Sequence, residues 1–325
     1  MSQASESMIP PPSGPRSLAS APGSGAPMAG SPMAGPPLRR LRYRIEYGAF
    51  WCIAAIAQAL PLELCARWSA WCWRRLGRFN RRRRRALEQI AFAFPEMSEA
   101  ERQAIHVQMW ENLGRVFAET FHLKDFMEDE QRYEMTSMDE LRKFIAQNPR
   151  FVIVSLHSAN WELAALGPLR AGLRIAGIYQ AIKNPYVDAY VTRLREPLYP
   201  AALLTKSRDT PRRFIKLMRE GVVVAMMSDL REARGVEVPF FGRLAPSTSF
   251  PALLAVGHDL PMLAVRTIRL PNSNFQFDWQ VLTPIREHAT REENVLATTA
   301  KVQSCFESWV RERPGEWMWV HRRWG

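Results

Sequence analysis

From Arg150 onward, short hydrophobic runs alternate with stretches whose apolar residues recur at helical spacing. Runs of this length and composition favour β-strands, and the amphipathic stretches between them favour helices. The predicted strands are residues 151–156, 174–180, 222–228, 261–270 and 276–282, and the predicted helices are residues 161–171, 188–198, 210–221 and 249–258. This alternation predicts an α/β fold with a mostly parallel or mixed central sheet flanked by helices.

The part of the chain before residue 125 has a different pattern. An apolar stretch at residues 48–60 ends at Pro61, and two amphipathic segments separated by Pro95 follow a run of arginines. The second segment opens with Ser98 and Glu101, which have the spacing of a capping box. As a helix, the apolar stretch at residues 48–60 would be about 20 Å long. A perpendicular membrane span needs roughly 20 residues, or about 30 Å of helix, so this stretch is too short.

Tryptophans and arginines are interleaved around this apolar stretch. Arginines lie on both sides of it, whereas a simple span usually has an excess of positive charge on one side. The tryptophans are Trp51, Trp68, Trp71 and Trp73. The mixture predicts helices that lie in a membrane interface with arginines among the headgroups. A short anchor that enters the bilayer and a buried core helix are the alternatives.

These patterns divide the chain into three regions. Residues 1–38 are rich in Pro, Gly, Ala and Ser, with nine of the 24 prolines before residue 38, and this composition predicts a disordered tail. Residues 39–125 form the predicted helical, membrane-associated region. Residues 126–325 form the predicted α/β domain.

Composition narrows the choice of partner. The chain has 44 Lys and Arg against 32 Asp and Glu, a net charge of +12, which favours polyanionic partners. Within the run of five arginines, Arg81, Arg82 and Arg83 are predicted contacts to a membrane or another anionic partner. No nucleic-acid partner is predicted, because no recognition helix, RNP-type signature or zinc finger accompanies the arginines. The four cysteines lack a CxxC pair and nearby histidines at zinc spacing, so no metal is predicted.

Candidate chemistry lies at the end of the first predicted strand of the α/β region. His157 directly follows the strand, a turn of small polar residues comes next, and Glu162 lies in the first turn of the following helix. Functional groups in α/β sheets concentrate at the carboxyl ends of strands. We expect Glu162 to accept the ring N–H of His157, which would leave the other ring nitrogen as a base. A structural histidine at the edge of the sheet is the alternative.

The same five-residue spacing occurs twice more in the chain. His106 and Glu111 fall within a predicted helix, where this separation points the side chains about 140° apart, and His106 is expected on the helix surface. His288 and Glu293 fall in a polar connection without a preceding strand. Only the pair at 157 and 162 therefore has the context of a site.

Two further observations bear on the chemistry. The chain has no G-x-S-x-G, H-E-x-x-H or phosphate-loop motif, and no serine is marked as an activated nucleophile. A histidine base without an enzyme nucleophile indicates direct transfer, in which the base activates a substrate hydroxyl that attacks an activated acyl group.

Asp229 also follows a predicted strand, a position that favours a site role in holding an arginine or a sugar hydroxyl. A structural ion pair is the alternative for Asp229.

A set of motifs in chain order carries a family resemblance. They are FVIVSL followed by HSANWE, KNP at 183–185 followed by Arg195, SDL at Asp229, GVEVPFFGRLA at 235–245 and the terminal EWMWVHRRW at 316–324. Together they resemble the late acyltransferases of lipid A biosynthesis, the lauroyl and myristoyl transferases, within the lysophospholipid acyltransferase-like superfamily. The resemblance extends over about residues 41 to 324.

The resemblance implies an acyltransferase without cofactor or metal, at the cytoplasmic face of the inner membrane. Its donor would be acyl carrier protein or coenzyme A, and its acceptor the hydroxyl of a 3-hydroxyacyl chain on a lipid A precursor. His157 and Glu162 would be the catalytic pair, Arg195 the oxyanion donor, and Lys183, Asn184 and Asp229 substrate-binding residues.

The alternative functions are an acyltransferase for another membrane lipid and a non-catalytic basic protein that binds membranes or nucleic acid. Of the terminal tryptophans, Trp317 and Trp319 are expected to pack in the core.

Overall fold

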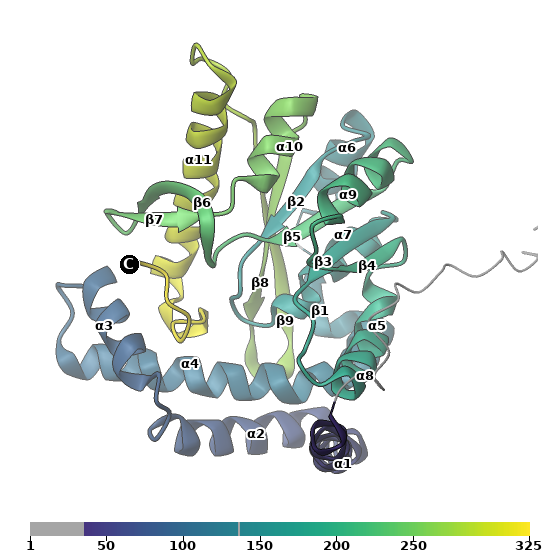
Figure 1. Ribbon diagram of the computed structural model, residues 1–325, viewed down its shortest axis with the longest axis vertical. Coiled ribbons are helices and arrows are strands. Elements are labelled where there is room, and N and C mark those ends of the chain that lie inside the picture. Colours follow the sequence, from purple (N-terminus) through teal and green to yellow (C-terminus); the bar gives the residue numbers. More distant parts are fainter. Residues whose placement is uncertain (1–35, 136) are drawn as a thin grey trace, which may run out of the picture.

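The computed structural model describes residues 36–135 and 137–325 (Figure 1). The predicted disordered tail lies outside this range for residues 1–35. Its last two predicted residues, 37 and 38, instead belong to the first helix, α1 (Pro37–Ala59), which begins with Pro37 in its first turn. Proline is well suited to this position because its missing N–H would be unpaired there in any case.

A seven-stranded sheet forms the centre of the molecule, in the order β1-β9-β8-β2-β5-β3-β4. Only β8 and β9 pair antiparallel, and the other neighbours are parallel. The strands are β1 (Tyr133–Met135), β2 (Val152–Ser155), β3 (Ile175–Tyr179), β4 (Ala202–Thr205), β5 (Val223–Met227), β8 (Met262–Arg269) and β9 (Phe275–Leu282). The predicted α/β fold with a mostly parallel, mixed sheet is confirmed, and so are all five predicted strands.

Four other strands were missed by the sequence patterns. β1 and β4 are edge strands of only three and four residues. β6 (Arg231–Phe240) and β7 (Arg243–Ser247) form a separate antiparallel hairpin. Its two-residue turn holds Phe241 and Gly242 at φ values of 52° and 73°, the left-handed conformation that tight hairpin turns require.

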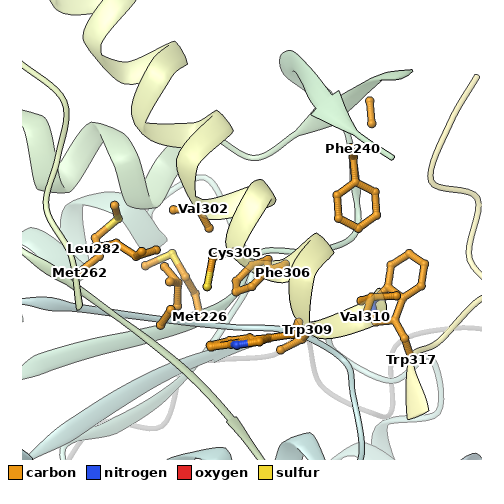
Figure 2. Close-up of a cluster of buried hydrophobic side chains, with 14 of the residues drawn as sticks. Met226, Phe240, Met262, Leu282, Val302, Cys305, Phe306, Trp309, Val310 and Trp317 are labelled. Carbon is orange, nitrogen blue, oxygen red and sulfur yellow. The ribbon is translucent and has the colours of Figure 1, made fainter. Parts of the chain in front are cut away.

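Helices cover both faces of the sheet. Val152 and Val154 of β2 belong to one buried cluster, whereas Phe151 and Ile153 belong to the other, as expected when successive side chains of a strand point to opposite faces. Figure 2 shows the first cluster, in which α11 packs Cys305, Phe306 and Trp309 against the sheet. The helices of the α/β part are α6 (Met138–Gln147), α7 (Leu166–Arg170), α8 (Pro185–Arg195), α9 (Thr210–Arg219), α10 (Phe250–His258) and α11 (Arg291–Glu312).

The N-terminal part of the described chain is helical. After α1 come α2 (Leu62–Gly77), α3 (Arg83–Ala93), α4 (Glu99–Glu119) and α5 (Leu123–Glu128). The predicted capping box at Ser98 and Glu101 opens α4. Figure 1 shows α2 and α4 side by side below one end of the sheet. Their backbones approach closely at Gly114, where a Cβ would meet the carbonyl oxygen of Ser69 at 2.8 Å.

The N-terminal helices and the turn after α2 expose many large apolar side chains. They are Leu38, Leu41, Ile45, Trp51, Ile53 and Ile56 on α1, Trp68, Trp71 and Leu76 on α2, and Phe79 in the following turn. We call this set the apolar face. None of the helices in residues 36–135 and 137–325 combines the length and hydrophobicity needed to cross a membrane.

The C-terminal segment folds back into the molecule beside α3 and α4. Trp317 and Trp319 are 1% and 0% exposed, so the prediction that they pack in the core is confirmed. Trp324 is also buried, and its indole N–H donates to the carbonyl oxygen of Phe240 at 3.1 Å. This segment therefore supplies a wall of the region at the carboxyl ends of the strands.

Candidate active site

The register of two neighbouring strands brings His157 and Asp229 together. β2 and β5 are parallel neighbours, and Ser155 lies opposite Met227. Two residues further along each chain, at the carboxyl ends of the strands, the opposite positions are 157 and 229. The ring Nδ1 of His157 lies 2.8 Å from Asp229 Oδ1, and its backbone N–H donates to Asp229 Oδ2 at 2.9 Å. The predicted strand-end position of both residues is thus confirmed.

The acceptor for the His157 ring differs from the prediction. Glu162 was expected to accept the ring N–H, but Asp229 occupies that place. The reason is geometric: residue 229 is fixed opposite residue 157 by the sheet, whereas Glu162 lies in the first turn of a separate 3-10 helix, Trp161–Ala165. Asp229 is also held by Trp317, whose indole N–H donates to Oδ2 at 2.8 Å.

Burial and charge compete at this pair. Burial disfavours the imidazolium form, but the carboxylate of Asp229, with a smaller contribution from Glu162, outweighs it and raises the pKa of His157. For Asp229, burial favours the neutral acid, but the charge and hydrogen bonds of His157 and the Trp317 indole outweigh it and lower the pKa. An ionised Asp229 only accepts hydrogen bonds, so a neutral His157 carries its proton on Nδ1. Nε2 is then the free basic nitrogen.

Glu162 forms a second charged pair at the same edge of the sheet. Arg195, the last residue of α8, donates to Glu162 Oε1 at 2.5 Å, and the Trp161 indole N–H donates to the same oxygen at 3.1 Å. The side chain of Glu162 is 7% exposed and that of Arg195 is 21% exposed. The Nε atom of Arg195 is buried without a hydrogen-bond partner among the described residues.

The turn between His157 and Glu162 is held by a buried network. Ala159 has φ of 48°, a strained value for a residue with a side chain. Asn112 donates to its carbonyl oxygen at 3.0 Å. Asn160 caps the 3-10 helix by accepting from Glu162 N–H at 3.2 Å and donates to Glu119 at 2.9 Å. Asn160 thus caps this short helix, and the network behind it was not predicted.

A cavity of about 420 Å³ opens beside Glu162 and Arg195. This volume lies within the roughly 300–1,000 Å³ typical of small-molecule sites. Its lining is mainly apolar and comes from α2, α4 and the C-terminal segment. The lining residues are Trp73, Asn80, Arg82, Trp110, Leu113, Val116, Phe117, Thr120, Trp161, Glu162, Arg195, Met318 and Val320. We call it the apolar pocket. Trp161 connects it to His157, because the centres of their rings lie 5.4 Å apart.

The remaining predicted site residues lie elsewhere. Asn184 is the N-cap of α8, accepting from Tyr186 N–H, and it donates to Tyr43 and Glu46 of α1. It therefore anchors the helix that presents Arg195 and lines no described cavity. Lys183 is exposed beside it.

The three arginines that were predicted to contact an anionic partner lie in different surroundings. Arg82 lines the apolar pocket, and Arg81 lines a different cavity. Arg83 donates to Gln103 of α4 at 3.2 Å.

The two other histidine and glutamate pairs behave differently from the strand-end pair. His288 is exposed, and Glu293 caps α11 together with Thr290. Glu111 pairs with Arg74 at 3.0 Å. His106, however, is only 2% exposed and accepts from the Trp110 indole N–H at 3.0 Å. The prediction of a helix-surface histidine was wrong, because α4 is packed on several sides.

A histidine base held by a buried carboxylate, next to an arginine and an apolar pocket, suits transfer of an apolar group to a hydroxyl. Comparison with known families gives the class as acyltransferase. Residues 36–325 match the family of bacterial lipid A biosynthesis acyltransferases. The chain belongs to this family, and the resemblance inferred from the motifs is confirmed.

Individual relatives agree with this assignment. The chain is 28% identical to the lipid A biosynthesis lauroyltransferase of Escherichia coli K12 over 257 residues, covering 76% of this chain and 80% of the relative. It is 23% identical over 261 residues to the myristoyltransferase of the same organism, covering 76% of this chain and 77% of the relative. It is also 23% identical over 256 residues to the palmitoleoyltransferase, covering 75% and 79%.

Proposed function

We propose that this acyltransferase moves a fatty acyl chain from acyl carrier protein, or coenzyme A, to the hydroxyl of a 3-hydroxyacyl chain on a lipid A precursor. The hydrogen-bonded pair of His157 and Asp229 next to the apolar pocket is the observation that carries the proposal. The names of the relatives support a lipid A precursor as the acceptor.

His157 is the proposed general base. Asp229 holds the proton of the neutral ring on Nδ1, so Nε2 takes the proton of the acceptor hydroxyl as its oxygen attacks the thioester carbonyl carbon. The carbon–sulfur bond then breaks, and the protonated His157 returns the proton to the departing thiolate. One histidine thus serves both halves of the transfer, and the products are an ester and a free thiol.

Glu162 and Arg195 are the proposed stabilisers of the tetrahedral intermediate. Arg195 has an unused buried N–H, and a guanidinium near the carbonyl favours the negative charge that develops on its oxygen. Glu162 fixes the guanidinium through the 2.5 Å hydrogen bond. Glu162 is therefore proposed to act through Arg195 and not by direct contact with the base.

The apolar pocket is the proposed site of the acyl chain. Its tryptophans, Phe117 and Met318 offer apolar surface, while Glu162 and Arg195 lie at its polar part. A thioester bound with its chain among these residues would place its carbonyl near Arg195. The relatives are named for acyl chains of different lengths, and the lining of this pocket is the natural place for such a choice.

The apolar face is the proposed membrane contact. Tryptophan and phenylalanine side chains are favoured at the level of the headgroups. Arg74, Arg75 and Arg78 lie next to Trp71 and Phe79, where they can meet anionic lipids. We infer that the protein lies on the cytoplasmic surface of the inner membrane through α1 and α2.

Mass spectrometry of lipid A tests the proposal in cells. A strain that lacks the protein should accumulate lipid A lighter by one ester-linked acyl chain, and wild-type protein should restore the mass. The His157→Ala variant at equal abundance should fail to restore it. An unchanged lipid A profile, with the mass change found in another lipid, would contradict the proposal.

A further inference from the structure

A second cavity, of about 340 Å³, is surrounded by arginines. Its lining residues are Arg81, Arg84, Arg85, Glu88, Gln89, Phe92, Arg243, Arg322 and Trp324. We call it the arginine pocket. The arginines come from α3 and the turn before it, from the β6–β7 hairpin and from the C-terminal segment. Segments far apart in the sequence thus bring five positive charges to one cavity.

Four of these five arginines have no ion-pair partner among the described residues. Arg84 pairs with Glu88 at 3.5 Å, in an exposed i,i+4 pair. The other four, Arg81, Arg85, Arg243 and Arg322, form no ion pair within residues 36–135 and 137–325. Five arginines that share a cavity with one carboxylate, that of Glu88, repel one another, so an anion that binds between them is favoured.

The walls of the pocket are fixed to one another by buried hydrogen bonds. Gln89 of α3 donates to the carbonyl oxygens of Trp319 and His321 at 2.7 and 2.8 Å, and accepts from Arg323 N–H at 2.6 Å. The Arg323 guanidinium reaches the hairpin through Ser247 at 2.7 Å. Pre-organised walls reduce the entropic cost of ligand binding.

One arginine is positioned within the pocket by an aromatic ring. The guanidinium of Arg243 lies 4.0 Å from the ring centre of Phe92, and Phe92 packs edge to face against Trp324 at 4.9 Å. A guanidinium held in this way keeps its N–H donors available, and their fork matches the oxygens of a phosphate.

The arginine pocket and the apolar pocket are lined by neighbouring residues of the same two segments. Arg82 lines one and Arg81 the other, while Met318 and Val320 line the apolar pocket and Arg322 and Trp324 the arginine pocket. The two cavities therefore share the turn before α3 and the C-terminal segment as walls.

From this arrangement we infer that the arginine pocket binds a phosphate monoester on the sugar headgroup of the acceptor lipid. The inference rests on the proposed function, because it assumes a phosphorylated glycolipid acceptor. A recess of this size admits a phosphosugar, whereas an acidic carrier protein needs an open surface. The bound phosphate would hold the acceptor while its hydroxyl reaches His157 along the shared walls.

Steady-state kinetics with the full chain test this assignment. In the double variant Arg243→Gln, Arg322→Gln, KM for a phosphorylated lipid A precursor should rise at least about tenfold, the cost expected when charge-assisted hydrogen bonds are lost. KM for the acyl thioester should stay within about twofold. The matched control is Arg212→Gln, Arg213→Gln on α9, which removes two exposed charges elsewhere and should leave both constants within about twofold.

Other outcomes would overturn the assignment. A rise in KM for the thioester donor alone would assign the arginines to the carrier. Weaker binding to phosphatidylglycerol vesicles, with an unchanged acceptor KM, would assign them to membrane lipids. A phosphatase-treated acceptor with the same KM as the phosphorylated one would also contradict the inference. If the first double variant fails to fold, as judged by circular dichroism, Arg81→Gln, Arg85→Gln replaces it.

Direct binding separates this inference from the proposed function. Saturation-transfer NMR with glucose 1-phosphate as the probe should give signals with the wild-type protein, none with glucose, and none with the double variant. This measurement needs no acyl transfer. If the wild-type protein fails to acylate lipid A precursors yet binds the probe through these arginines, only the proposed function is contradicted. If the probe does not bind, the inferred phosphate site is contradicted.

Discussion

His157 owes its proton position to Asp229, a residue 72 positions away in the chain. The same carboxylate accepts three hydrogen bonds, two from His157 and one from the Trp317 indole. Trp317 was predicted only to pack, and it also donates a hydrogen bond to the carboxylate that holds the His157 ring. At the scale of single residues, the site therefore has two charged pairs: His157 with Asp229, and Glu162 with Arg195.

Removal of the Asp229 charge should change both the rate and its pH dependence. In the wild-type protein, kcat/KM should rise with pH through a midpoint above the ordinary histidine value of about 6.5, because Asp229 raises the pKa of His157. In Asp229→Asn the midpoint should fall, since burial then dominates, and kcat should drop about 10²–10⁴-fold. Asp209→Asn, an exposed aspartate without a hydrogen-bonded side chain, is the control. A profile that does not move would contradict this role for Asp229.

The three glutamates at the same spacing provide an internal comparison. Glu162→Ala should lower kcat by at least about tenfold, because Arg195 loses the carboxylate that fixes it. Glu111→Ala and Glu293→Ala should leave kcat within about twofold, although Glu293→Ala removes the glutamate of the capping box of α11 and should lower stability slightly. Equal losses of kcat in all three variants would show that the wrong acid had been chosen.

At the scale of elements, local patterns predicted strands and most helices but could not predict which strands are neighbours. β2 and β5 lie side by side although β3 and β4 come between them in the chain, and parallel pairing of distant strands leaves no local signal. That order is what brings Asp229 to His157. The strand-end positions of both residues were visible in the sequence, whereas their contact was not.

His106 shows the same limit for a helix. Its spacing to Glu111 was judged on α4 alone, but α2, α3 and the C-terminal segment also pack on α4. Contacts from elements distant in sequence, and not the periodicity of one helix, decide which of its faces are buried.

The burial of His106 makes stability depend on pH. Burial lowers the pKa of His106 to about 4, so between that value and the ordinary value of about 6.5 the folded protein binds fewer protons than the unfolded chain. Stability should fall as the pH falls through this window. His106→Leu removes the acceptor of the Trp110 indole N–H and should destabilise the protein by about 1–3 kcal/mol at neutral pH, a difference that shrinks towards pH 4.

Urea unfolding of the wild-type protein and of His106→Leu between pH 4 and 8 measures this pH dependence of stability. The exposed His288 gives the control, and His288→Leu should change stability by less than about 0.5 kcal/mol at every pH. A pH-independent difference between wild type and His106→Leu would mean that His106 does not titrate as its burial requires.

At the scale of the whole molecule, α2 contributes both to the apolar face and to the lining of the apolar pocket. α2 presents Trp68 and Trp71 outward and Trp73 to the pocket. With the proposed membrane contact, α2 would connect the lipid surface to the pocket. The sequence predicted the tryptophan and arginine content of this region, but only the packing of α2 on α4 shows which side chains remain exposed.

Vesicle sedimentation tests the membrane contact. Trp68→Ser, Trp71→Ser should weaken binding to vesicles of bacterial phospholipids at least about tenfold, because two exposed indoles are lost from the apolar face. The matched control is Leu244→Ser, Leu296→Ser, which removes two exposed apolar side chains, 58% and 42% exposed, outside that face. Equal binding by both double variants would argue against attachment through α2.

The activity of His157→Ala is the most direct measurement of the central claim. Purified wild-type and variant proteins with matching circular dichroism spectra would be compared for transfer of an acyl chain from acyl carrier protein to a lipid A precursor. We predict a loss of kcat/KM of about 10²–10⁴-fold, the contribution of a general base. A folded His157→Ala variant that transfers acyl chains at the wild-type rate would contradict the account.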